Sequence, residues 1–275
     1  MQVIIDTKKI QDIPILTMVP GGKSIYPVVF FIPGFKSGKE TGLSLGYKLA
    51  REGFYFVSID PWLHGERYDM RLHQAADPKY GGVYPEDTGL DAYFLMMKVI
   101  GRCLADVRTL IDELDGDPLA DLEHCGMTGI SMGGYASFLV FANLSRIQAA
   151  VPMIGLPSFT RCWLDVLDEC RFSNQGWAAA LERLEVHSKQ QTAYVEQLDP
   201  YEKLKEAPPR ALLIMNNDFD SDQPKSYSIY AYRKLLPYYK DYPGKLKLNI
   251  YLAGHTVTPE MEREAVEWFC CHLKQ

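Results

Sequence analysis

A serine at the centre of a Gly-x-Ser-x-Gly sequence is the clearest candidate for chemistry in this chain. Residues 127–140 read MTGISMGGYASFLV, so Ser131 lies between Gly129 and Gly133. An apolar, strand-like run leads into Gly129 and a helix-patterned segment leaves Gly134, which is the strand, turn and helix of a nucleophile elbow. The glycines would prevent clashes where the sharp turn meets neighbouring chain. The pattern therefore predicts that Ser131 is a nucleophile.

A serine hydroxyl needs a base to remove its proton, and histidine is the usual choice. Three histidines follow Ser131, namely His187, His255 and His272. His187 falls in a helical insertion and His272 in the final helix pattern. His255 lies in YLAGHTVTPEM, directly after an apolar strand and before a helix start. That position is a loop at the carboxyl edge of a sheet, so His255 is the predicted base.

The base in turn needs an acid that fixes its tautomer, and the chain order of an elbow enzyme is Ser, Asp or Glu, His. The segment LLIMNNDFDSDQP, directly after another apolar strand, offers three aspartates: Asp218, Asp220 and Asp222. Residues two apart on an extended segment point the same way, so position alone leaves Asp218 and Asp220 open. For Asp222, loop solvation or a helix N-cap is the expected role.

The elements that must position these residues alternate between strand-like and helix-like patterns. Strands are expected over 27–32, 54–60, 124–130, 148–155, 210–217 and 245–253, and helices over 37–53, 90–114, 135–147, 226–239 and 259–273. Continuous apolar strands that alternate with helices are typical of a sheet buried on both faces. The predicted fold is therefore α/β, with a mostly parallel central sheet flanked by helices, in one domain over residues 1–275.

Residues 156–207 interrupt the alternation, because they contain helix-like patterns and no strand before the breaker EAPPR. An insertion of this size between two strands is expected to form a helical cap over the carboxyl edge of the sheet, where sites in open α/β sheets lie. A structural helical hairpin without ligand contacts is the alternative. Aromatic residues that could line a pocket there, or in the loop at 67–88, are Tyr68, Tyr80, Tyr84, Phe159, Trp163 and Trp177.

Four stretches of residues 25–272 resemble motifs of the α/β-hydrolase superfamily. FFIPGF is similar to the strand and turn that supply half of an oxyanion hole, and SIDPWLHGER to an Asp-x-x-x-His-Gly-x-Ser/Arg stretch. ISMGGY and GHTVTPEM resemble small bacterial esterases of the prolyl-oligopeptidase and dienelactone-hydrolase-like branch. The departures are Pro33, where histidine is usual, and Asn217, where glycine is usual.

The resemblance implies roles for particular residues. In this family a strand is followed by Gly-x-x-Asp and then, four residues later, by Pro. Asn217, Asp220 and Pro224 occupy these places here, which makes Asp220 the acid. The backbone N–H groups of Phe35 and Met132 would form the oxyanion hole.

The function implied is that of a serine hydrolase, a carboxylesterase that works through an acyl-enzyme and needs no metal or organic cofactor. An amidase or peptidase, an acyltransferase and a catalytically silent binding module of the same fold are the alternatives. For Asp60 and His64 in SIDPWLHGER, a structural role beside the elbow is expected.

Composition excludes other classes of function. The 275 residues carry a net charge of −6 and no basic run longer than a pair, which argues against nucleic acid as a partner. No apolar stretch approaches the ~20 residues of a membrane span, and the start lacks a secretory leader. Six cysteines without CxxC or zinc-finger spacing are expected to be reduced thiols in a cytoplasmic protein. The expected partner is a small-molecule ester; its identity, its acyl chain and a homodimer are left open.

Overall fold

The centre of the protein is one eight-stranded sheet with the strand order β1-β2-β4-β3-β5-β6-β7-β8. The computed structural model describes residues 2–22, 24–72, 88–173 and 178–274, with side chains at 88–91 and 169–187 also outside the description. The strands are β1 (Val3–Ile10), β2 (Ile13–Pro20), β3 (Tyr26–Ile32), β4 (Tyr55–Ile59), β5 (Ala120–Ile130), β6 (Ile147–Met153), β7 (Ala211–Asn217) and β8 (Leu246–Tyr251). The strands from β4 through β3 to β8 pair in parallel, whereas β1 and β2 pair antiparallel. The prediction of a mostly parallel sheet is confirmed.

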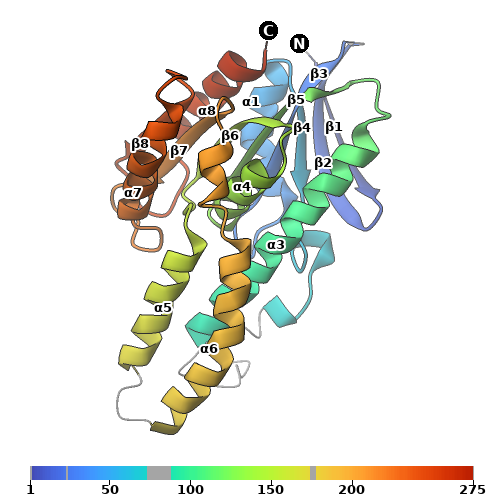
Figure 1. Cartoon of the computed structure of the whole chain (residues 1–275). Helices are drawn as coiled ribbons and strands as arrows, with labels where there is room; N and C mark the ends of the chain where they lie inside the picture. The colour runs from blue at the N-terminus through green and yellow to red at the C-terminus, as the bar shows by residue number, and fades with distance from the viewer. Residues whose placement is uncertain (1, 23, 73–87, 174–177, 275) are drawn as a thin grey trace.

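Helices cover both faces of this sheet (Figure 1). They are α1 (Leu43–Arg51), α3 (Thr88–Leu114), α4 (Met132–Asn143), α5 (Phe159–Ser173), α6 (Ala178–Leu198), α7 (Lys225–Leu235) and α8 (Pro259–Leu273), with short 3-10 turns η1 (Lys39–Gly42), η2 (Gly65–Arg67), η4 (Lys203–Glu206) and η5 (Leu236–Tyr239). The α1 and α8 helices pack on one face and α3 and α4 on the other, while α7 lies along β7 and β8. Among the described helices, none combines the length and the apolar character that crossing a membrane requires.

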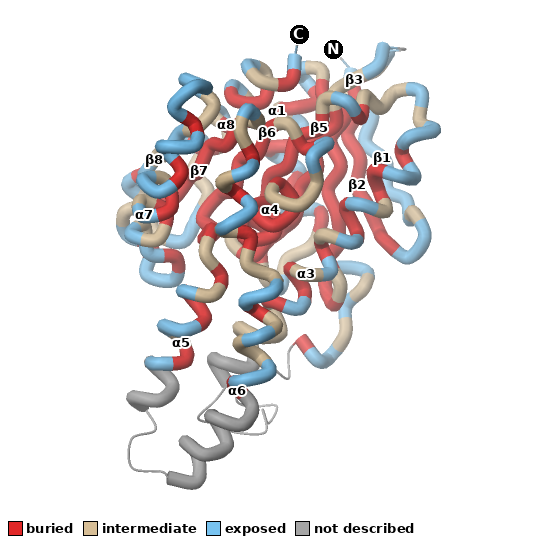
Figure 2. The backbone as a smooth tube through the Cα atoms, in the orientation of Figure 1, coloured by how far each residue is buried: buried red, intermediate tan, exposed pale blue. Residues whose placement is uncertain are grey.

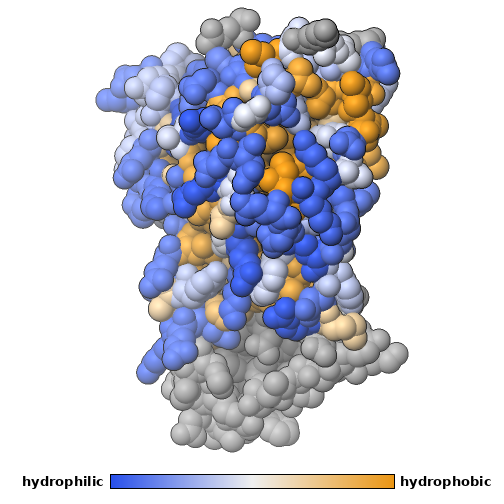
Figure 3. Space-filling model, turned by 90° about the vertical axis from the view of Figure 1, so that its right-hand side faces the viewer, coloured by the Kyte–Doolittle hydropathy of each residue, from blue (hydrophilic) through white to orange (hydrophobic). Residues whose placement is uncertain are grey.

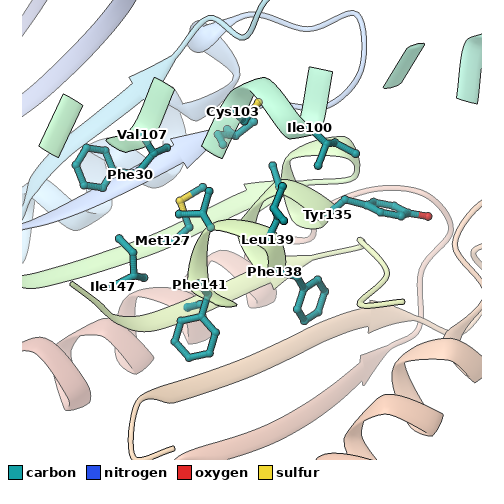
Figure 4. Packing of buried hydrophobic residues seen from close by; sticks show 14 of the residues in the cluster. Phe30, Ile100, Cys103, Val107, Met127, Tyr135, Phe138, Leu139, Phe141 and Ile147 are labelled. Carbon is teal, nitrogen blue, oxygen red and sulfur yellow. The ribbon is translucent and has the colours of Figure 1, made fainter. Parts of the chain in front are cut away.

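Two apolar layers fill the spaces between the sheet and its helices. Successive strand residues point to opposite faces, so Phe30 joins the layer under α3 and α4 whereas Phe31 joins the layer under α1 and α8. The central strands are buried along their length (Figure 2). In Figure 4 Leu139 of α4 points toward α3, whereas Phe138 and Phe141 point the other way, and the Tyr135 hydroxyl points away from the labelled aliphatic groups. The α4 helix, which follows Ser131, is therefore held rigidly within the core.

The hairpin of β1 and β2 has no counterpart in the predicted elements. All eight residues of β2 are buried, whereas β1 is exposed along most of its length. Its turn places Gln11 at a φ of 53°, a conformation for which glycine or asparagine would have been the sequence signal. The exposed residues of β1 include Ile4 and Ile5. The side of the molecule to the right of Figure 1 is mostly hydrophilic, with apolar side chains in a few patches (Figure 3).

The expected insertion at 156–207 contains α5 and α6, which contact each other and α3 and extend away from the sheet (Figure 1). Within its described residues the insertion contains no strand, as the sequence predicts. Phe159 and Trp163 are fully buried, and the Trp163 indole N–H donates to Thr192 Oγ1 at 2.8 Å. These two aromatics therefore serve the core. Tyr80, Tyr84 and Trp177 lie outside the described residues, and Tyr68 is exposed.

Candidate active site

Ser131 lies on the sharp turn between β5 and α4. Its backbone has φ 56° and ψ −113°, outside the regions that residues other than glycine favour. Two hydrogen bonds hold this conformation: the Ser131 N–H donates to the Met153 carbonyl at 2.9 Å, and the Tyr135 N–H donates to the Ser131 carbonyl at 3.0 Å. Such a conformation costs roughly 1–3 kcal/mol and persists only where the surroundings enforce it. The turn exposes the hydroxyl beyond the end of the sheet.

The glycines around Ser131 provide the space that this turn needs. A Cβ atom on Gly129 would lie 2.4 Å from the Gly133 carbonyl oxygen, and one on Gly133 would lie 1.9 Å from the Ile32 carbonyl oxygen. A Cβ atom on Gly134 would lie 2.6 Å from the Met153 carbonyl oxygen. Only glycine allows β3, β5 and β6 to approach α4 this closely. The predicted reason for the glycines at 129 and 133 is confirmed.

A chain of hydrogen bonds connects Ser131, His255 and Asp220, whose sequence positions are far apart. The His255 Nε2 atom lies 3.0 Å from Ser131 Oγ, and His255 Nδ1 lies 2.9 Å from Asp220 Oδ2. Since the carboxylate accepts at Nδ1, the imidazole proton belongs on Nδ1 and Nε2 is free to accept the serine proton. The Asp220 side chain is fully buried and that of His255 is 32% exposed. The structure thus brings together all three side chains predicted from the sequence.

The three aspartates of the loop after β7 have different partners. Asp220 Oδ1 accepts the backbone N–H groups of Asp222 at 3.0 Å and Gln223 at 2.9 Å, which leaves Oδ2 for the imidazole. Asp218 forms an ion pair with Lys225 instead. Asp222 is exposed, and its carboxylate lies within 4.8 Å of Asp220 and His255. The geometry therefore favours Asp220 over Asp218 as the partner of the base.

The backbone N–H groups of Phe35 and Met132 lie on two segments that meet beside Ser131. Met132 is the first residue of α4, and the first N–H groups of a helix have no partner within the helix. A Cβ atom on Gly34, which precedes Phe35, would lie 3.5 Å from the Ile130 carbonyl oxygen and 3.8 Å from Ser131 Cβ. The turn after β3 therefore packs against the elbow. That both amides serve an oxyanion stays a prediction.

Asp60 and His64 belong to a buried network next to this turn. The buried Asp60 carboxylate accepts the Lys39 N–H at 2.7 Å and the Lys39 ammonium at 2.9 Å. His64 donates from Nδ1 to the Trp62 carbonyl at 2.9 Å, and its ring meets the Phe35 ring edge at a centroid distance of 5.6 Å. Burial lowers the pKa of His64, so it is neutral at pH 7. These contacts agree with the structural role expected for both residues.

Two groups of contacts near the site were missed by sequence reasoning. The Asn217 side-chain amide donates to the carbonyls of Gly254 and Thr256, which flank His255. The Tyr135 hydroxyl donates to Gln223 Oε1 at 2.7 Å and so joins α4 to the loop that carries the acid. The one sequence signal was Asn217 itself, because it stands where the resemblance expects glycine.

Competing nucleophiles and ligands are limited among the described residues. Burial raises the pKa of the Cys125 and Cys162 thiols to about 12, so neither is a thiolate at neutral pH. The described cysteines are free: Cys103, Cys125 and Cys162 are buried, Cys270 is half-buried and Cys271 is exposed. The one group of described residues close enough to hold a metal ion is Asp220, Asp222 and His255. Both ring nitrogens of His255 already have partners there, which makes this a poor metal site.

Of the other two histidines after Ser131, the structure describes the side chain of His272, which takes no part in this chain of hydrogen bonds. His272 lies in α8 against Lys245 and the Trp268 ring. The side chain of His187 is outside the described residues.

Comparison with known proteins bears on the fold. The chain is 24% identical over 273 residues to "Putative esterase YitV" of Bacillus subtilis, covering 98% of this chain and 99% of the relative. No family model matches. Among solved structures, an acetyl xylan esterase from Paenibacillus sp. R4 matches with a TM-score of 0.65 and 15% identity, over 98% of this chain and 89% of that one. The acylaminoacyl peptidase of Pyrococcus horikoshii matches with a TM-score of 0.65 and 20% identity, over 100% of this chain and 42% of that one. At these identities the likeness establishes a shared fold.

Proposed function

Since the chain has the α/β-hydrolase fold, we propose that it is a serine hydrolase that cleaves carboxylic esters through an acyl-enzyme. The observation that carries the proposal is the unbroken chain of hydrogen bonds from Asp220 through His255 to Ser131. A nucleophile, a base and an orienting acid in this order are what acyl transfer from an ester requires.

In the first half of the reaction, Ser131 Oγ attacks the ester carbonyl carbon while His255 Nε2 takes the hydroxyl proton. Asp220 stabilises the resulting imidazolium through Nδ1. The negative charge on the carbonyl oxygen would be met by the N–H groups of Met132 and Phe35, a stabilisation of roughly 3–4 kcal/mol per donor in serine hydrolases. The C–O bond then breaks, and His255 returns the proton to the departing alcohol.

In the second half, water replaces the alcohol and His255 Nε2 takes a proton from it. The hydroxide attacks the acyl carbon, the bond to Ser131 Oγ breaks, and the proton returns to the serine. The products are a carboxylic acid and the original enzyme. Every proton in this cycle passes through one ring nitrogen, and the 3.0 Å contact to Ser131 places that nitrogen within transfer distance.

Ester rather than amide as the substrate is supported by the names of two similar proteins, a Bacillus subtilis esterase and an acetyl xylan esterase. Because a peptidase is among the similar structures, cleavage of amides is the alternative to test. Matched p-nitrophenyl esters and p-nitroanilides of the same acyl group should separate the two, with faster turnover of the esters. Faster turnover of the anilides would make the protein an amidase or peptidase. Transfer of the acyl group to an added alcohol in preference to water would make it an acyltransferase.

The mechanism itself is tested by labelling with a fluorophosphonate probe. The intact protein should label on Ser131, and Ser131→Ala should not. Ser137→Ala is the matched control, because Ser137 is a buried serine on α4, the helix after Ser131, and its hydroxyl donates to the Gly133 carbonyl at 2.7 Å. That variant should label like the intact protein. Equal labelling of Ser131→Ala would show that another residue reacts and would exclude Ser131 as the nucleophile. No labelling of the intact protein would favour the silent binding module.

A further inference from the structure

We propose that Asn217 is a positioning residue for His255, holding the loop of the base in the register that catalysis needs. The inference rests on the proposed function, because it assigns a task within the same site. Asn217 is the last residue of β7, three residues before Asp220. One strand end would then carry both the acid that orients the imidazole and the amide that holds the imidazole's own loop.

Both side-chain N–H groups of Asn217 are used on that loop. The amide nitrogen lies 2.5 Å from the Gly254 carbonyl oxygen and 2.7 Å from the Thr256 carbonyl oxygen. These are the carbonyl groups of the residues on either side of His255. A flipped amide would place its oxygen against two carbonyl oxygens, so the hydrogen bonds themselves fix the orientation.

The amide oxygen of Asn217 shows that this arrangement has a cost. Asn217 is fully buried, and its Oδ1 atom has no hydrogen-bond partner among the described residues. A buried acceptor without a partner destabilises a protein, because it loses its hydrogen bonds to water without replacement. A glycine or an apolar residue would leave no buried acceptor without a partner. What asparagine adds at this position is therefore the two hydrogen bonds that it donates.

Other contacts hold the loop of the base at its two ends, by hydrogen bonds to β7 before it and by packing of Val257 into the layer under α1 and α8 after it. The β7–β8 ladder continues past the strands as Asp218 N–H to the Tyr251 carbonyl at 2.8 Å and Phe219 N–H to the Ala253 carbonyl at 3.0 Å. Beyond Ala253 the chain turns away, and both His255 and Thr256 are exposed. Among the described residues, the Asn217 amide is the group of the sheet that binds the carbonyls of residues 254 and 256.

This attachment should affect the chemical step more than substrate binding. The imidazole must keep Nε2 about 3 Å from Ser131 Oγ while Nδ1 stays on Asp220, and both contacts depend on where the backbone of residue 255 lies. A misplacement of about 1 Å can lower a rate by about 100-fold. Loss of Asn217 should therefore lower kcat and leave KM nearly unchanged.

The neighbouring residue provides a matched control. Asn216 is also fully buried, but its side chain donates to Ser228 Oγ at 2.9 Å, in α7 and away from the base. Asn217→Asp and Asn216→Asp add the same carboxyl group at adjacent positions. In Asn217→Asp an oxygen faces the two loop carbonyls. In Asn216→Asp the carboxyl can still accept the Asn217 N–H, and the Ser228 hydroxyl can turn to donate.

The experiment measures kcat and KM for a short p-nitrophenyl ester with the full-length protein and its variants. Asn217→Asp and Asn217→Ala should lower kcat roughly 10- to 100-fold with KM within about threefold of wild type, whereas Asn216→Asp should stay within about threefold in both. The proton NMR signal of the His255 Nδ1–H, compared between Ser131→Ala and the same protein with Asn217→Ala, should weaken or shift when the amide is lost. This second readout needs no turnover, and the dispersion of the amide signals in the same spectra shows whether the variant is folded.

Two kinetic results would overturn the proposal: kcat of both Asn217 variants within about threefold of wild type, or an equal loss in Asn216→Asp. An unchanged imidazole signal would overturn it as well. Absence of hydrolysis by the wild-type protein is a different outcome. It would refute the proposed function, while the NMR comparison would still report whether Asn217 holds the loop.

Discussion

Replacing Gly133 by alanine should disable the site through a contact that can be calculated from the structure. The new Cβ atom would lie 1.9 Å from the Ile32 carbonyl oxygen, 2.6 Å from the Ile32 carbonyl carbon and 2.9 Å from the Pro33 carbonyl oxygen. An ordinary non-bonded contact is about 3.5 Å, so β3 and α4 must separate by about 1.6 Å, the difference between 3.5 and 1.9 Å. Overpacking of this kind typically destabilises a protein by roughly 1–3 kcal/mol.

The same displacement should lower activity, because Ile32 and Pro33 lead directly into the turn that carries Phe35. A shift of about 1 Å at a reacting group can lower the rate about 100-fold. We therefore expect kcat/KM of Gly133→Ala on a p-nitrophenyl ester to fall about 100-fold or more. The melting temperature should fall by roughly 2–4 °C for each kcal/mol of lost stability.

The control for this substitution is Gly116→Ala, because a Cβ atom on Gly116 meets no atom of the described residues within 4 Å. Its activity should match that of wild type. Melting curves by circular dichroism and initial rates on the ester measure both effects. A Gly133→Ala protein with wild-type melting temperature and rate would mean that the crowded approach of β3 to α4 is not needed by the site.

Three further predictions concern the acid, the buried histidine and the buried ion pair. Asp220→Asn should lower kcat by about 10⁴-fold in a folded protein. Asp218→Asn should have a mild effect on kcat, because the Asp218 carboxylate pairs with Lys225. A larger loss of kcat in Asp218→Asn than in Asp220→Asn would make Asp218 the acid. Burial holds the pKa of His64 below its usual 6.5, so the unfolded chain takes up a proton first as the pH falls. The contribution of neutral His64 to stability is therefore complete above about pH 6.5 and is lost as the pH falls below it. In urea titrations at several pH values, His64→Asn should flatten the slope of unfolding free energy against pH by up to ~1.4 kcal/mol per pH unit. An unchanged slope would show that His64 does not set it. Lys39→Met leaves the buried Asp60 carboxylate without its cation and should lower the free energy of unfolding by about 3–5 kcal/mol. Adding Asp60→Asn should recover part of this loss. Equal stability of the single and double variants would refute this explanation.

The elements that could be predicted from the sequence are those whose pattern and punctuation agree. The last helix begins at Pro259 with Thr258 as its N-cap, whose hydroxyl accepts the Met261 N–H at 3.2 Å, and the prediction of 259–273 matches its bounds. The hairpin of β1 and β2 lacks such agreement. The exposed residues of β1 do not alternate with buried ones, and β2 contains two prolines, a residue that is uncommon in sheets.

The chemistry of the site follows the same division. Ser131 and His255 could be found because each lies where an apolar strand ends and a turn begins, and a strand end fixes the edge of the sheet on which a side chain appears. Asp220 required the additional spacing supplied by a family resemblance. The contacts of Asn217 could not be predicted in this way, because its partners are main-chain carbonyls, which exist at every residue and leave no trace in the sequence.

The structure therefore changes how asparagine at position 217 is interpreted. By itself, asparagine in place of the usual glycine weakens the case that this segment carries the acid. In the structure the same residue donates both of its N–H groups to the loop of the base, three residues before the acid that the base contacts. A residue that departs from a motif can thus reinforce the site, provided that the added side chain finds partners within it. For this chain the departure and the hydrogen bonds lie at one position, so substitution of Asn217 tests whether the exposed loop of His255 needs this attachment.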